Sequence, residues 1–197
     1  RVSFRQSLGE GFAVVRRNPP VAGALLVAAA SEGFAFTAIP LVPFIAKNSL
    51  DLGSAGLGLL LAAEGFGSIL ASLAVAIASR RFTAYGRLML IGSGASMLIS
   101  FGIITSQWFP VTLILLIALG STGATFFMMQ TNLILSLTPR ASRGRLVGLQ
   151  MLVIGMFPIG SLMVGALASW TSPQLAVAFM SAAGLVALLL IGLAFPV

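Results

Sequence analysis

Six long apolar stretches, separated by short connections, constrain this chain more than any other feature. A helix needs about 20 apolar residues to cross about 30 Å of hydrocarbon. Apolar residues make up 58% of the chain and charged residues 8%, against roughly half and a quarter in soluble domains. The sequence therefore predicts an all-α membrane protein, with no interval long enough for a soluble domain. We expect the membrane-spanning helices at residues 21–46, 54–78, 88–105, 109–137, 147–169 and 174–196.

The basic residues are confined to alternate connections. Ten of the eleven lie before the first apolar stretch, after the second or after the fourth, and the other three connections hold only Lys47. Basic loops stay on the cytoplasmic side of a membrane, whereas Trp residues such as Trp108 and Trp170 prefer the membrane–water boundaries. We therefore expect both ends of the chain in the cytoplasm, and we expect the membrane to be the inner membrane of a bacterium.

The composition excludes several classes of protein. The chain has no Cys and no His, which removes thiol and imidazole catalysis and the usual zinc ligands. Its net charge of +7 comes from separate connections rather than from one basic face, so membrane lipid is an expected partner and nucleic acid is not. An intramembrane enzyme would have only Ser, Tyr85 or two glutamates for its chemistry. We expect no enzyme, no metal and no cofactor.

Residues 1–20 differ from the remainder, 21–197, which holds the six spans. Apolar residues recur there at helical spacing with arginines between them, at Val2, Phe4, Leu8, Phe12 and Val15. This pattern predicts a short amphipathic helix on the cytoplasmic surface of the membrane, and an unstructured linker is the alternative. Because the chain begins with Arg1 rather than Met, we interpret it as a piece of something longer.

Two of the four acidic residues lie inside predicted spans, Glu32 in the first and Glu64 in the second. A charge at that depth costs roughly 2.5–3.5 kcal/mol, and no Lys or Arg lies inside a span to pair with it. Glu64 shares one helical face with Ser68 and Ser72. Proton coupling or contact with a substrate is the functional interpretation of these residues. The alternative is a neutral, hydrogen-bonded carboxyl group that serves helix packing.

Three amides form a second polar group. Gln130 and Asn132 lie towards the cytoplasmic end of the fourth span, and Gln150 lies at a similar depth in the fifth. They are expected either to line an inner vestibule or to hydrogen-bond the two helices together. Such interhelical bonds contribute about 0.6 kcal/mol on average.

Glycines and a proline interrupt the fifth span. Gly155, Pro158 and Gly160 lie within eleven residues that end at Gly165. Proline removes a backbone donor and bends a helix, and flanking glycines give the bend room. The pattern predicts a helix bend, a construction that suits a helix that must flex or slide.

The chain resembles the carboxy-terminal half of a major facilitator superfamily transporter over essentially all of its length. Segment 138–148, with the run Arg143-Gly144-Arg145, is similar to the Pro…Arg-Gly-Arg loop before the eleventh helix of many members. The run 155–165 resembles the Gly…Pro-x-Gly pattern of that helix. Segment 10–19, which contains Glu-Gly and Arg-Arg-Asn-Pro, is similar to the central connector in the branch that contains the enterobactin exporter.

This resemblance implies a twelve-helix transporter in two six-helix halves that bind a small-molecule substrate between them. The required partner is an amino-terminal half, in the same chain or as a separate subunit. Arg140, Arg143, Gly144 and Arg145 would form a cytoplasmic hinge or latch. The glycine–proline run resembles a motif of antiporters. The expected function is proton-coupled export of a small hydrophobic compound by alternating access.

A second function remains open at this point. Because fold does not dictate function, a six-helix remnant with few polar side chains would also suit a structural or assembly subunit of a larger membrane complex, without transport activity. A coding sequence of this length alone would favour the assembly subunit. A continuous reading frame of about twice this length would favour the transporter.

Overall fold

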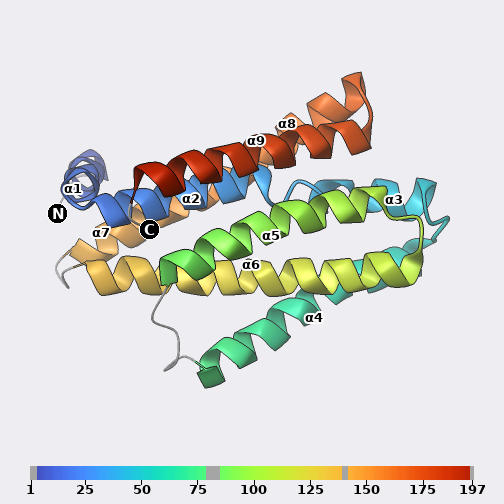
Figure 1. Ribbon diagram of the computed structural model, residues 1–197, viewed down its shortest axis with the longest axis horizontal. Coiled ribbons are helices and arrows are strands. Elements are labelled where there is room, and N and C mark those ends of the chain that lie inside the picture. Colours follow the sequence, from blue (N-terminus) through green and yellow to red (C-terminus); the bar gives the residue numbers. More distant parts are fainter. Residues whose placement is uncertain (1–3, 79–84, 139–141, 196–197) are drawn as a thin grey trace.

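A computed structural model describes residues 4–78, 85–138 and 142–195, and within these ranges the chain is helical, with no strand (Figure 1). Six helical segments are long and apolar enough to cross a membrane. The prediction of an all-α membrane protein is confirmed. The six segments run Pro19–Asn48, Ser54–Ala78 (α4), Tyr85–Thr105 (α5), Phe109–Leu137 (α6), Arg143–Trp170 and Pro173–Ala194 (α9).

The first of these segments is not one continuous helix. It consists of α2 (Pro19–Phe34), a short 3-10 helix η1 (Ile39–Leu41) and α3 (Val42–Asn48). Pro40 and Pro43 open the second and third pieces, where a missing N–H is tolerated. The carbonyl of Ala35 accepts a 2.6 Å bond from the Ser100 hydroxyl of α5. The sequence predicts one span over residues 21–46, whereas the structure interrupts the helix after Phe34 and resumes it at Val42.

The fifth segment is also divided. Helix α7 covers Arg143–Ile154 and α8 covers Phe157–Trp170. The amide of Gly155 still bonds the Met151 carbonyl, and the amide of Met156 bonds Val153 with the tighter spacing of a turn. The interruption falls within the glycine–proline run, just before Pro158, which lies in the first turn of α8, where its missing N–H is tolerated.

Residues Phe4–Arg17 form a separate helix, α1. In Figure 1 the turns of α1 are seen nearly end-on while the long helices run across the page, so α1 lies crosswise to them. Gly11 is buried against α7, where an added methyl group would lie 2.9 Å from Leu149 Cδ1. The connector is therefore a helix that packs against the bundle.

Small residues and hydroxyl groups hold the long helices together, as expected where lipid supplies no hydrophobic drive between helices. The Ser31 and Ser93 hydroxyls bond each other between α2 and α5. Ser96 donates to Thr122 at 2.8 Å, which links α5 to α6. Ser181 donates to the Met97 carbonyl at 3.1 Å, which links α9 to α5.

Charged and aromatic residues mark opposite ends of this bundle. The start of α5, the start of α7 and the end of α1 lie at one end with the two chain termini, and they carry Arg87, Arg143 and Arg17 (Figure 1). Trp108 precedes α6 at the other end and is 73% exposed. The bundle therefore has one arginine-rich end.

Candidate functional site

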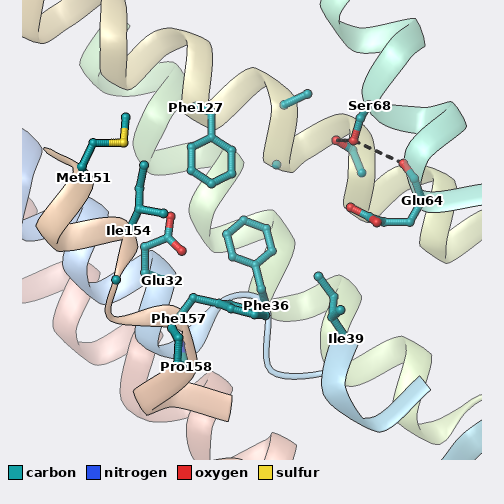
Figure 2. Close-up of a pocket in the computed structure, with 14 residues that line it drawn as sticks. Glu32, Phe36, Ile39, Glu64, Ser68, Phe127, Met151, Ile154, Phe157 and Pro158 are labelled. Carbon is teal, nitrogen blue, oxygen red and sulfur yellow. Dashed lines mark hydrogen bonds between the residues drawn. The ribbon is translucent and has the colours of Figure 1, made fainter. Parts of the chain in front are cut away.

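One cavity of about 730 Å³ brings the two membrane-embedded glutamates together. Side chains from the first two spans, from α6 and from the divided fifth span form its walls. Figure 2 shows Glu32 and Glu64 on opposite sides of this cavity, with the rings of Phe36 and Phe127 between them. The lining residues are Glu32, Phe36, Ile39, Glu64, Ser68, Gly120, Gly123, Ala124, Phe127, Met151, Ile154, Gly155, Phe157 and Pro158.

Glu32 lies in the last turn of α2 and is only 4% exposed. Its Oε1 atom has no hydrogen-bond partner among the described residues. The next residue, Gly33, lies directly against Gly160 of α8, where an added methyl group would meet the Gly33 carbonyl oxygen. This glycine contact fixes the turn that carries Glu32 against the fifth span.

Glu64 lies in the middle of the continuous helix α4 and is half-buried. Its turn is held by a reciprocal contact with α6. A methyl group added to Gly67 would overlap the Ile117 carbonyl, and one added to Gly120 would overlap the Glu64 carbonyl. The backbones of α4 and α6 thus touch on both sides of this crossing, as glycine permits.

Two serines complete this crossing. Ser68 donates to the Gly120 carbonyl at 3.1 Å, and Ser121 donates to the Gly67 carbonyl at 3.0 Å. Ser68 also lies 3.2 Å from the Glu64 carbonyl of its own helix. Ser68 therefore both lines the cavity and links α4 to α6. Ser72 is exposed and does not line this cavity.

Three phenylalanines form a ring cluster at the cavity wall. Phe36 and Phe127 are nearly parallel, with ring centroids 6.1 Å apart and an interplanar angle of 6°. Phe126 is fully buried and lies edge-on to both rings, at 5.3 Å from Phe127 and 6.5 Å from Phe36. Gly123 makes room for Phe36, because an added methyl group would lie 3.2 Å from its Cε1 atom.

The interruption of the fifth span borders the same cavity. Gly155 and Pro158 both line it, together with Phe157 at the start of α8. Gly160 instead faces α2. The structure thus brings the predicted bend and the two glutamates to one place.

The three predicted amides lie elsewhere, and none of them lines the cavity. Gln150 donates to the Thr131 hydroxyl at 3.0 Å and so links α7 to α6. Asn132 is exposed. Gln130 is fully buried, and within the described part of the chain its amide atoms have no hydrogen-bond partner. The bond from Gln150 supports the packing interpretation of this group.

The predicted hinge or latch loop precedes α7. Arg140 lies outside the described residues. Arg143 begins α7, and its Nε donates to the Thr138 carbonyl at 3.3 Å, so it ties the end of α6 to the start of α7. Gly144 is exposed, with open space where a side chain would stand. Arg145 is half-buried, and its carbonyl lies near Gly11 of α1.

The sequence did not single out the aromatic lining. Phe36 follows Glu32 by four residues, which places both on one helical face, and this spacing is the signal that was available. Phe127 and Ser121 follow the glycines of α6, and the crossing with α4 becomes visible only when the helices are packed.

Four of the six apolar segments line a cavity with two carboxyl groups, and together with the family match this identifies a membrane transport protein of the major facilitator type. More particularly, the chain belongs to the family described as transmembrane secretion effector, whose family model matches residues 2–197. A comparison with curated proteins finds no match for this chain.

Proposed function

We propose that this chain forms the carboxy-terminal six-helix half of a proton-coupled exporter that works by alternating access. One observation carries the proposal: the two glutamates inside the spans, 32 residues apart in sequence, line one cavity beside an interrupted helix. The family match supports a membrane transporter. The Arg-Gly-Arg run and the glycine–proline run favour the superfamily, and segment 10–19 favours the branch that contains the enterobactin exporter.

The cavity suits a small hydrophobic substrate. Its volume of about 730 Å³ lies within the range of about 300–1,000 Å³ found for small-molecule sites. Its walls are mainly aromatic and aliphatic, with Phe36, Phe127, Met151 and Ile154 among them. Such walls bind apolar surface, and the few polar groups set the specificity.

Glu64 is the proposed proton-coupling residue. None of the described residues that line the cavity is basic, so a neutral carboxyl group is favoured while the site is dry, and a carboxylate is favoured where water enters. Glu64 is half-buried on a helix with little cover, whereas Glu32 is 4% exposed. Water therefore reaches Glu64 first as the site opens.

The missing amino-terminal half is the proposed partner, in the same chain or as a separate subunit. Two walls of the cavity belong to the two least buried spans. In the most apolar 18-residue stretch of each, 22% of the residues are buried in α4 and 11% in the fifth span. A second six-helix half would cover these helices and close the site between the halves. The arginine-rich end would face the cytoplasm of a bacterium, with both termini there.

The interruption at Gly155 and Met156 is the proposed flexing point. Helix α7 carries the Arg143–Arg145 latch at one end, and α8 is fixed to α2 through Gly160. A change of angle between α7 and α8 would move the cytoplasmic gate without disturbing the contact at Glu32.

Transport by the complete protein tests this function. In proteoliposomes, export of a panel of cationic, neutral and anionic hydrophobic compounds is measured with and without a pH gradient. Glu64→Gln is expected to reduce gradient-driven export to the level of protein-free vesicles, because glutamine cannot carry the proton. Folding and membrane insertion should be retained.

Asp51→Asn is the matched control. Asp51 is exposed between α3 and α4 and has φ 49°, a conformation that Asn also adopts. This variant should transport as the wild type does. Unchanged gradient-driven export by Glu64→Gln would remove the coupling role, and a wild-type protein that exports none of the panel would favour the assembly subunit.

A further inference from the structure

The chemistry of the cavity selects the charge of its ligand. We propose that the cavity binds an organic lipophilic cation, with Glu32 as its counter-ion and the Phe36–Phe127 pair as its aromatic surface. This proposal rests on the proposed transport function, and it names the class of substrate that the site accepts.

The first argument is electrostatic. Among the lining residues only Glu32, Glu64 and Ser68 have polar side chains, and none is basic. The Ser68 hydroxyl is already engaged by the backbone of α6. An anionic ligand would face two acidic groups without a compensating charge, and a purely apolar ligand would leave Glu32 unpaired. Burying two carboxyl groups without a partner is unfavourable, and a cationic ligand is attracted to both of them.

The second argument is the state of Glu32. This side chain is 4% exposed, it lines the cavity, and its Oε1 atom lacks a hydrogen-bond partner among the described residues. Buried polar atoms are nearly always paired in folded proteins, so an unpaired buried oxygen on a residue that lines a cavity indicates a missing group. A bound cation would supply that group.

The third argument is the ring cluster. Cations are attracted to the faces of aromatic rings within about 6 Å of the centroid. Phe36 and Phe127 present nearly parallel ring planes, and the buried Phe126 holds both of them edge-on. In Figure 2 the two rings lie between the carboxyl groups. A ligand that reaches Glu32 therefore passes along aromatic surface.

The same residues do not suit an inorganic cation. Hard metal ions take about six or more oxygen ligands, and the cavity offers two carboxyl groups on opposite sides (Figure 2). Within the described ranges no three His, Cys, Asp or Glu side chains gather as metal ligands. An organic cation needs one counter-ion and apolar contact, which this cavity provides.

Two ions of matched shape and opposite charge test the proposal. Equilibrium binding of tetraphenylphosphonium and tetraphenylborate to the complete purified transporter is compared at neutral pH without a gradient. We expect tetraphenylphosphonium to bind at least about tenfold more tightly than tetraphenylborate. Glu32→Gln should weaken binding of the cation by about tenfold and reduce the difference between the two ions. Asp51→Asn should change neither.

A second pair of variants keeps the test valid if Glu32→Gln does not fold. Glu32→Asp retains the charge and should keep the preference for the cation. Phe127→Leu retains apolar contact but removes a ring, and it should weaken the cation more than the anion. Equal affinity for the two ions in the wild type, or unchanged cation binding in Glu32→Gln, would overturn the proposal.

This experiment also separates the inference from the function on which it rests. Binding needs no proton gradient, so a failure of gradient-driven export leaves the cation site standing. Conversely, a protein that exports neutral or anionic compounds and binds no tetraphenylphosphonium would keep its transport function and lose the cation site.

Discussion

Glu32 and Glu64 reach one cavity on helices of opposite character. The span that carries Glu32 is interrupted and central, and 67% of the residues in its most apolar 18-residue stretch are buried. Helix α4 is continuous, and 22% of the residues in its own such stretch are buried. The Oε1 atom of Glu32 has no hydrogen-bond partner among the described residues, and the side chain of Glu64 is half-buried. The two carboxyl groups can therefore serve two roles: Glu32 pairs with a bound cation inside the bundle, and Glu64, which lies nearer water, exchanges the proton.

The two glutamates also belong to different helix pairs. A glycine contact joins α2 to α8 beside Glu32, and another joins α4 to α6 beside Glu64. Each carboxyl group is therefore attached to its own helix pair, while the stacked rings of Phe36 and Phe127 lie between the two pairs. A shift of one pair relative to the other would change the separation of the carboxyl groups and the shape of the cavity.

The largest effect is expected at the α4–α6 crossing. A methyl group at Gly120 would overlap the Glu64 carbonyl, so the backbones must separate. Gly120→Ala should lower the free energy of unfolding by about 1–3 kcal/mol and should displace Glu64. Unfolding of the complete protein in mixed micelles, followed by circular dichroism, measures the change.

Gly65→Ala is the control on the Glu64 side of this crossing. Open space surrounds Gly65, and alanine favours a helix over glycine by about 0.5–1 kcal/mol. The control should therefore match or exceed the stability of the wild type. Equal losses in the two variants would show that the close approach of α4 and α6 does not hold Glu64.

A smaller effect, a difference of about tenfold in labelling rate, is expected when a water-soluble reagent reacts with a thiol at each of the two positions. Because this chain has no cysteine, Glu32→Cys and Glu64→Cys each introduce a single thiol into it. With the other half made cysteine-free, the thiol at position 64 should react with a hydrophilic maleimide about tenfold faster, since thiolate formation and reaction need water. Labelling followed by mass spectrometry gives both rates. A faster reaction at position 32 would reverse the assignment of the two roles.

The sequence predicted the positions of the helices better than it predicted how the helices pack against one another. Hydropathy placed the spans within a few residues, and the glycine–proline run marked the division of the fifth span. Both signals are local, because a helix is bounded by its own composition and its own missing donors.

The sequence could not predict that Glu32 and Glu64 line the same cavity, because this depends on how the two helices are rotated about their axes. That rotation is set by distant contacts, such as Gly67 against Ile117. The three amides illustrate the same limit: similar depth in the membrane did not show which groups bond across the helices, and Gln150 bonds Thr131 rather than Gln130 or Asn132.

The most direct measurement is proton release on ligand binding. Tetraphenylphosphonium is added to weakly buffered complete transporter, and the protons released per bound ion are counted with a pH dye. The cation's charge favours the carboxylate form of Glu64, so the wild type should release up to about one proton per bound ion. Glu64→Gln should bind the ion and release fewer protons than the wild type. Wild-type release from that variant would contradict the coupling of proton and substrate through Glu64.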